Sequence, residues 1–302
     1  MSCSEHRFES EDGLSLYYRS YGSGDDVVVC LPGLTRNSRD FEDLAEHLAA
    51  NRQRPWRVIC PDMRGRGRSD YDPKPSGYRP SVYVRDIWRL LDLLEVNRVV
   101  VIGTSLGGLL AMVMAHQRPD RLRGCVLNDV GPEFPPAAVA RILEYVGRTP
   151  PVADWDAAVA EARKQYAPVF PGAPDDFWPR YVRRFWAENA EGRPAPDYDP
   201  AVGDAMRKAQ SALKLARWLR RLGLKSLGGM PTDAWDAFDA LTVPCLLVRG
   251  VLSDVLTDDI VERMRRRKPD LEVVDVPERG HAPLLDEPLV LAAIDRFLAR
   301  LA

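Results

Sequence analysis

Residues 99–108 read VVVIGTSLGG, and this stretch decides the fold class of the chain. Its four leading apolar, mostly β-branched residues predict a buried strand, and Leu109–His116 behind it predicts a helix. The turn between them, Gly103–Gly107, has the pattern Gly-x-Ser-x-Gly, in which glycines let the backbone pass where a Cβ would clash. This order of strand, sharp turn and helix predicts that Ser105 is raised above the carboxyl edge of a parallel sheet.

The rest of the chain extends this α/β pattern in both directions. Short continuous apolar runs predict strands buried on both faces of a sheet: Val27–Leu31, Arg57–Cys60, Val99–Ile102, Gly124–Leu127 and Pro244–Val248. Alternating residues predict an antiparallel hairpin over His6–Ser10 and Leu14–Tyr21, and an exposed edge strand over Leu271–Val276. Helices are predicted at Asp40–Ala50, Ser81–Glu95, Ser105–Gln117, Asp258–Lys268 and Pro288–Leu301. We therefore expect a mostly parallel twisted sheet with helices on both faces.

The alternation of strands and helices is interrupted over residues 132–240, which are rich in Pro, Trp and Arg. We interpret this segment as a helical lid inserted into a core that residues 1–131 and 241–302 form. It contains no credible buried strand, and its predicted helices are Pro136–Gly147, Trp155–Tyr166, Asp176–Glu188 and Asp204–Leu222. Ala212–Leu222 is basic and amphipathic, and we interpret it as a lid helix seated on the core rather than a membrane-surface helix.

The amino-acid composition indicates which kinds of molecule the protein is not expected to bind. The 302 residues carry 42 basic and 44 acidic side chains, so the net charge of −2 gives no reason to expect a nucleic-acid partner. No apolar run approaches the roughly 20 residues of a membrane span, and the polar start lacks a signal-peptide core, so we expect a cytoplasmic protein. The five cysteines are scattered without a Cys-x-x-Cys pair, and four histidines offer no metal-ligand spacing. We expect no bound metal ion and no cofactor. A homodimer is a possible assembly of this chain.

Three side chains provide the parts of an activated nucleophile, in the order Ser, Asp, His. Ser105 is the candidate nucleophile, Asp254 follows the strand over 244–248, and His281 follows the strand over 271–276. Loops at the carboxyl ends of parallel strands converge on one crevice, so these side chains are expected to meet. Asp129, directly after the strand over 124–127, is the alternative acid, although we favour Asp254.

These motifs give the chain a resemblance to the α/β-hydrolase fold superfamily, over about residues 10–130 and 240–300. The elbow around Ser105 is followed by Ser253-Asp254 and Gly280-His281, and Asp62–Ser69 matches the family's Asp-x-Arg-Gly-x-Gly-x-Ser loop, whose charges we expect to be structural. The loop Leu31–Leu34 stands at the family's oxyanion position, with Pro32 where many relatives have His. The resemblance implies an oxyanion hole made by the backbone amides of Leu34 and Leu106. A looser similarity is to 3-oxoadipate enol-lactonase-like proteins.

Candidate substrate contacts are less defined by the sequence. Arg36 lies just past the oxyanion loop and is either a surface cation or an anchor for a substrate carboxylate. The lid is expected to supply an apolar wall, with Trp186 among the candidates for substrate binding. That wall is drawn from the lid aromatics Phe134, Tyr145, Trp155, Phe170, Trp178, Phe185 and Trp186.

A serine at the elbow favours acyl chemistry and argues against the dehalogenases and epoxide hydrolases of this fold, which place a carboxylate there. We therefore predict a cofactor-independent serine hydrolase of a small carboxylic ester or lactone. Three alternatives remain: a carbon–carbon bond hydrolase of a ring-cleavage diketone, an acyltransferase, and a non-catalytic ligand receptor.

Overall fold

A computed structural model describes residues 3–51, 54–210 and 234–301. In this part of the chain, eight strands form one sheet in the order β1-β2-β4-β3-β5-β6-β9-β10. The hairpin of β1 and β2 is antiparallel, β2 joins β4 antiparallel, and all strands from β4 onward run parallel. The strand bounds are Ser4–Glu9 (β1), Ser15–Tyr21 (β2), Val27–Leu31 (β3), Arg57–Pro61 (β4), Val99–Thr104 (β5), Leu122–Asn128 (β6), Cys245–Gly250 (β9) and Glu272–Val276 (β10). The predicted hairpin, parallel strands and edge strand are confirmed.

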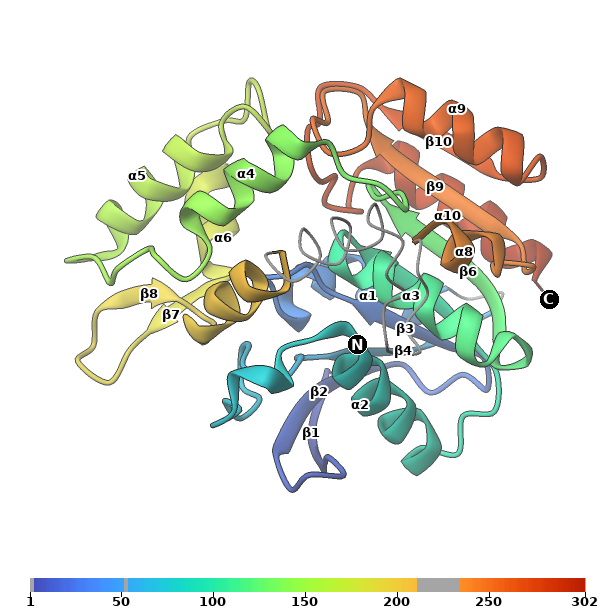
Figure 1. Ribbon diagram of the computed structural model, residues 1–302, viewed down its shortest axis with the longest axis horizontal. Coiled ribbons are helices and arrows are strands. Elements are labelled where there is room, and N and C mark those ends of the chain that lie inside the picture. Colours follow the sequence, from blue (N-terminus) through green and yellow to red (C-terminus); the bar gives the residue numbers. More distant parts are fainter. Residues whose placement is uncertain (1–2, 52–53, 211–233, 302) are drawn as a thin grey trace, which may run out of the picture.

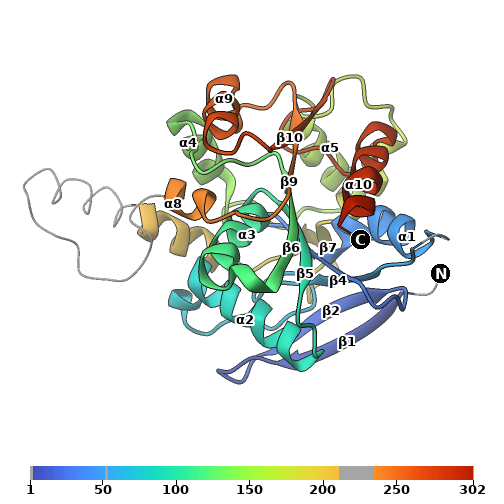
Figure 2. The same ribbon diagram turned by 90° about the vertical axis from the view of Figure 1, so that its right-hand side faces the viewer.

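Helices cover both faces of this sheet, as Figures 1 and 2 show. Alternate residues of β3 explain the two layers: Val27, Val29 and Leu31 pack on one side, and Val28 and Cys30 on the other. The first side is covered by α2 (Pro80–Leu93), α3 (Leu106–Gln117), α8 (Ala234–Asp239) and α9 (Asp258–Arg267), and the second by α1 (Glu42–Ala49) and α10 (Pro288–Arg300). The α/β sandwich predicted from the apolar runs is confirmed.

A long insertion separates β6 from β9, although these two strands are neighbours in the sheet. It contains α4 (Pro136–Tyr145), α5 (Trp155–Tyr166) and α6 (Phe177–Arg183), and residues 201–210 are also helical. Figure 1 shows α4, α5 and α6 grouped beside the sheet. The proposed basic amphipathic helix, Ala212–Leu222, lies outside the described residues.

One part of the insertion differs from the prediction. The helix expected over Asp176–Glu188 ends at Arg183, and a short hairpin follows, made of β7 (Trp186–Glu188) and β8 (Pro194–Pro196). The turn between them is closed by the amide of Asn189, which donates to the carbonyl of Arg193, and by Gly192 at φ 74°. The chain turns back at Gly192, where a positive φ suits glycine, and the prediction that the helix continues to Glu188 is wrong.

Candidate active site

Ser105 occupies a strained turn between β5 and α3. Its φ of 52° and ψ of −113° lie in a region that non-glycine residues rarely adopt. The turn is tight enough to demand glycine on both sides: a Cβ at Gly107 would lie 2.0 Å from the carbonyl oxygen of Leu31, and one at Gly103 would lie 2.4 Å from the backbone of Gly107. The elbow predicted from Gly-x-Ser-x-Gly is therefore present, and it holds the Ser105 hydroxyl at the carboxyl edge of the sheet.

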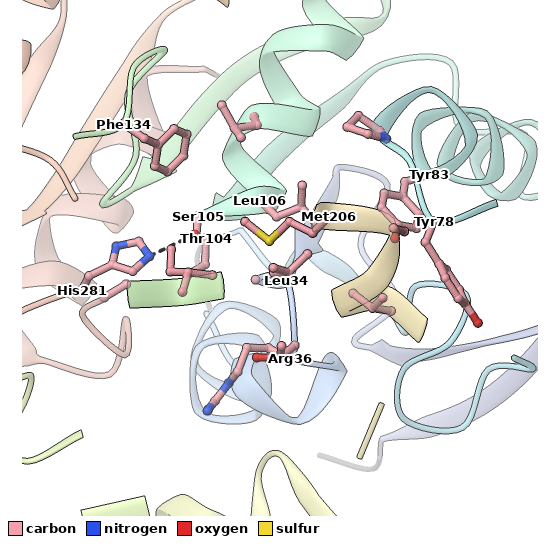
Figure 3. Close-up of a pocket in the computed structure, with 18 of the residues that line it drawn as sticks. Leu34, Arg36, Tyr78, Tyr83, Thr104, Ser105, Leu106, Phe134, Met206 and His281 are labelled. Carbon is pink, nitrogen blue, oxygen red and sulfur yellow. Dashed lines mark hydrogen bonds between the residues drawn. The ribbon is translucent and has the colours of Figure 1, made fainter. Parts of the chain in front are cut away.

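A chain of hydrogen bonds joins Ser105 to His281 and Asp129. Nε2 of His281 lies 2.9 Å from Oγ of Ser105, and Nδ1 lies 2.8 Å from Oδ2 of Asp129 (Figure 3 shows the bond to Ser105). Since a carboxylate only accepts, Nδ1 carries the proton that it donates to Asp129, and Nε2 is left to accept the hydroxyl proton of Ser105. The arrangement can therefore remove a proton from the serine.

The preference for Asp254 over Asp129 is corrected by this geometry. The carboxylate of Asp254 turns to solvent, with its side chain 52% exposed, and pairs with the guanidinium of Arg141 at 2.8 and 2.9 Å. Asp129 is fully buried and also accepts from the amide of Gly250 and the hydroxyl of Ser253. The end of β9 and the loop after it thus supply two donors to the Asp129 carboxylate, whereas Asp254 of that loop pairs with Arg141.

Strand register is the signal that separates the two candidates. Thr104 of β5 stands opposite Asn128 of β6, so the next residues, Ser105 and Asp129, leave adjacent strands at the same level. Both residues have positive φ values, 52° and 54°. The sequence predicts both strands but not their register, so it does not show which of the two acids lies level with Ser105.

The oxyanion candidates Leu34 and Leu106 line one cavity with Ser105. Leu106 begins α3, so its amide has no acceptor within the helix. The buried guanidinium of Arg66 donates to the carbonyl of Leu34 at 2.9 Å, which orients the loop that carries the Leu34 amide. Asp62 supports the same loop by accepting from the amide of Ser38 at 2.7 Å, and burial raises the pKa of this carboxyl. These contacts agree with the structural role expected of the Asp62–Ser69 motif.

The cavity has a volume of about 860 Å³ and lies between the sheet edge and the insertion. Of the seven lid aromatics, Phe134 and Tyr145 line it. Trp186 does not: its side chain packs in a buried cluster inside the insertion, and its candidacy for substrate binding is corrected on that ground. Tyr166 and Tyr181 line the cavity although the sequence analysis did not single them out, because no pattern tells which face of a lid helix turns inward.

Arg36 is a largely buried cation of the cavity wall and not a surface cation. Its side chain is 12% exposed and holds Asp40 through two hydrogen bonds of 2.6 and 2.7 Å. Its guanidinium carbon lies 3.8 Å from the ring centre of Phe185. Burial disfavours the charge of Arg36, but the Asp40 carboxylate outweighs that effect and raises its pKa.

The sequence analysis also expects no metal site and no membrane-spanning helix. Within the residues that the structure describes, no group of three His, Cys, Asp or Glu side chains could hold a metal ion. In the same part of the chain, no helix is long and apolar enough to cross a membrane. Cys30, Cys60, Cys125 and Cys245 are buried free thiols, as the apolar runs around them indicate.

Comparison with known proteins places this geometry in a family. The model of the alpha/beta hydrolase fold matches residues 26–288. The chain belongs to this family. A crystal structure of an alpha/beta hydrolase from Novosphingobium aromaticivorans is similar to this hydrolase, with 41% identity, a TM-score of 0.84, and coverage of 99% of this chain and 98% of that one. The resemblance stated from the motifs and the predicted enzyme class are both confirmed.

Two curated relatives match nearly the whole of this hydrolase. The 3-hydroxybutyrate-oligomer hydrolase of Cupriavidus necator is 32% identical over 275 residues, covering 90% of this chain and 87% of the relative. The 2-(acetamidomethylene)succinate hydrolase of Mesorhizobium japonicum is 29% identical over 287 residues, covering 94% and 92%. The two names describe different substrates, so sequence similarity alone does not identify the substrate of this hydrolase.

Proposed function

We propose that this hydrolase cleaves small carboxylic esters or lactones through a covalent acyl-enzyme. The observation that carries the proposal is the continuous hydrogen-bonded chain from Ser105 through His281 to Asp129 at the wall of a cavity large enough for a small substrate. Ser105 is the nucleophile, His281 the general base and then acid, and Asp129 the group that orients the imidazole.

The geometry supports the following sequence of steps. Oγ of Ser105 attacks the ester carbonyl carbon while its proton passes to Nε2 of His281, and buried Asp129 stabilises the resulting imidazolium. The tetrahedral oxyanion accepts hydrogen bonds from the amides of Leu34 and Leu106, each such donor contributing about 3–4 kcal/mol to transition-state stabilisation. The intermediate collapses, and His281 protonates the departing alcohol. Water then attacks the acyl-enzyme by the same path in reverse and releases the acid.

An ester is the substrate class with the most support. Ser105 provides an alkoxide-like nucleophile suited to acyl carbons, and the relative at 32% identity is named for hydrolysis of hydroxybutyrate oligomers, which are esters. The cavity wall contributed by the insertion is mainly apolar, through side chains such as Phe134, Val139 and Ile142. Such a wall suits the short carbon chain of an ester or lactone.

Substitution of the nucleophile tests the proposal. We expect Ser105→Ala to lower turnover of 4-nitrophenyl butyrate by about 10⁴-fold or more, because the loss of a triad member removes the acyl-enzyme route. A fluorophosphonate probe should label the wild type at Ser105, as peptide mass spectrometry can verify. Ser76→Ala, at a serine of the same cavity wall, should still be labelled. Undiminished turnover by Ser105→Ala would overturn the assignment.

A further inference from the structure

A polar cluster interrupts the cavity wall close to Ser105, and the proposed mechanism makes no use of it. Arg36 and Asp40 come from the core, and Tyr145, Tyr166 and Tyr181 come from α4, α5 and α6 of the insertion; all five line the cavity. Three helices of the insertion thus each contribute one tyrosine to the cavity that Arg36 also lines, and Tyr181 contacts Arg36 directly. Polar groups placed in an otherwise apolar wall are the usual means by which a pocket selects its ligand.

The aliphatic stem of Arg36 lies near Ser105. A Cβ at Gly33 would stand 3.3 Å from Cγ of Arg36 and 3.9 Å from Cβ of Ser105, so both residues border the same point of the oxyanion loop. Figure 3 shows Leu34 between Ser105 and Arg36. A substrate whose carbonyl reaches Ser105 therefore needs only a short chain to reach the cluster.

The charge of Arg36 is already neutralised. Its Nε and Nη2 both donate to the carboxylate of Asp40, and Nη1 lies 3.4 Å from the hydroxyl of Tyr181. A substrate carboxylate placed here would lose its hydration without gaining an unpaired cation, which is costly in a buried site. A neutral oxygen loses less hydration and can still accept hydrogen bonds.

The three tyrosines supply such hydrogen bonds. Burial raises the pKa of Tyr145, Tyr166 and Tyr181, so each phenol keeps its proton. None of the three hydroxyls donates to an acceptor among the described residues, whereas Tyr78, on the same cavity, donates to Asp199. Buried polar groups normally find partners, and donors left over in a cavity indicate a ligand that accepts from them.

We propose that Arg36, Tyr145, Tyr166 and Tyr181 form a subsite that binds a neutral oxygen, a hydroxyl or an ether or ester oxygen, on the substrate chain next to the scissile ester. The inference rests on the proposed ester hydrolysis and narrows its substrate class to oxygenated esters, such as hydroxyacyl esters and short oligoesters. It favours the chemistry named for the hydroxybutyrate-oligomer relative over the dicarboxylate named for the succinate relative.

Isosteric ester pairs test the subsite on either side of the scissile bond. Ethyl 3-hydroxybutyrate against ethyl 3-methylbutyrate places the oxygen on the acyl chain, and 2-methoxyethyl butyrate against butyl butyrate places it on the alcohol chain. The readout is the ratio of kcat/KM for the oxygenated ester to that for its isostere, measured by pH-stat titration. In the wild type, we expect this ratio to exceed one for at least one pair.

Removing single hydroxyls then identifies the donors. Tyr166→Phe and Tyr181→Phe should each lower that ratio about 5- to 10-fold, the value of one hydrogen bond, and Tyr145→Phe should act in the same direction. Tyr78→Phe is the matched control, since Tyr78 lines the same cavity but its hydroxyl already donates to the carboxylate of Asp199 at 2.5 Å; its ratio should stay at the wild-type value. A ratio unchanged in all three Phe variants, for both pairs, would overturn the subsite.

A charged substrate provides an independent check. We expect dimethyl succinate to be hydrolysed faster than methyl hydrogen succinate, since the neutral ester group suits the subsite and the carboxylate does not. Faster hydrolysis of the monoester anion would make Arg36 a carboxylate anchor and overturn the proposal. Ser105-dependent turnover with unchanged ratios rejects the subsite alone, whereas turnover that persists in Ser105→Ala rejects the proposed function and the subsite with it.

Discussion

At the scale of single residues, the candidate site depends on which carboxylate faces His281. Asp129 is held by three partners at once: the imidazole of His281, the amide of Gly250 and the hydroxyl of Ser253. Asp254 directly follows Ser253 in the chain, yet its carboxylate accepts hydrogen bonds from Arg141 and not from His281. Backbone conformation, and not proximity in sequence, decides which of the two carboxylates contacts His281.

Two amide substitutions distinguish these acids. Asp129→Asn should lower kcat by about 10⁴-fold, because an amide does not stabilise the imidazolium or select the required tautomer of His281. Asp254→Asn should change kcat by less than about twofold, since it breaks only an exposed ion pair worth at most about 1 kcal/mol. Steady-state kinetics with far-UV circular dichroism as the folding control makes the comparison. The opposite ranking would restore Asp254 as the acid.

At the scale of secondary-structure elements, the loop after β4 connects separate parts of the core. The guanidinium of Arg64, with no exposed surface, bonds Asp12 in the β1–β2 turn, Asp72 in the following loop and Asp86 in α2. Its neighbour Arg66 orients the oxyanion loop through the carbonyl of Leu34. The Asp62–Ser69 motif therefore positions the site by holding elements together, without contacting the proposed reacting atoms.

Arg64→Met should destabilise the fold by about 3–5 kcal/mol at pH 7, because it leaves buried carboxylates without their cation. Burial raises the pKa of Asp86 and Arg64 opposes that rise, so the substitution raises this pKa further. A carboxyl whose pKa is higher in the folded state destabilises the fold at pH values above its unfolded pKa, and the penalty shrinks as the pH falls. The deficit relative to wild type should therefore be smaller at pH 5 than at pH 7.

Urea unfolding at the two pH values measures this deficit. Arg68→Met serves as the control from the same loop, because the pair of Arg68 with Glu5 is exposed and its loss should cost about 1 kcal/mol or less. A deficit of Arg64→Met that is equal or larger at pH 5 would contradict the argument from Asp86.

At the scale of the whole molecule, the insertion is docked on the core through both apolar and polar contacts, the apolar ones including Val146 and Val202. Its aromatic cluster is separate from the two clusters that cover the sheet. Arg39 of the core bonds the carbonyl of Arg184 and the carboxylate of Asp197, and the amide of Gly280 donates to the carbonyl of Val169. We propose that these polar contacts, two of which Arg39 makes, hold the region around the β7–β8 hairpin on the core.

Arg39→Ala should loosen that docking. The substitution removes the partly buried hydrogen bonds of Arg39 to Asp197 and to the carbonyl of Arg184. We expect the rate of amide hydrogen exchange in peptides covering residues 184–198 to rise about 5- to 30-fold, equivalent to a fall of about 1–2 kcal/mol in the free energy of local opening. The midpoint of global unfolding should move little. Arg193→Ala, whose ion pair with Glu191 stays within the β7–β8 turn, should leave exchange elsewhere in this region unchanged. Equal exchange in both variants would argue against Arg39 as a docking residue.

Much of this molecule follows from local pattern. Continuous apolar runs located β3, β5 and β9, because a strand buried on both faces has no polar side. The Gly-x-Ser-x-Gly turn located Ser105, because no other residue type fits at Gly103 and Gly107. Local pattern gave a wrong prediction for the end of the helix over 176–188, where the β7–β8 hairpin begins instead. It was also wrong for Trp186, because the packing of this side chain inside the insertion depends on residues distant in sequence.

By itself, the sequence determined the α/β architecture, the elbow and the place of His281 after the last strand, since each depends on burial periodicity or turn stereochemistry within a few residues. Only the tertiary structure decided that Asp129 and not Asp254 meets His281, and that Arg36 is paired with Asp40 and contacts Tyr181. The physical reason is that register between β5 and β6, and the packing of the insertion on the oxyanion loop, arise from contacts between residues far apart in the chain.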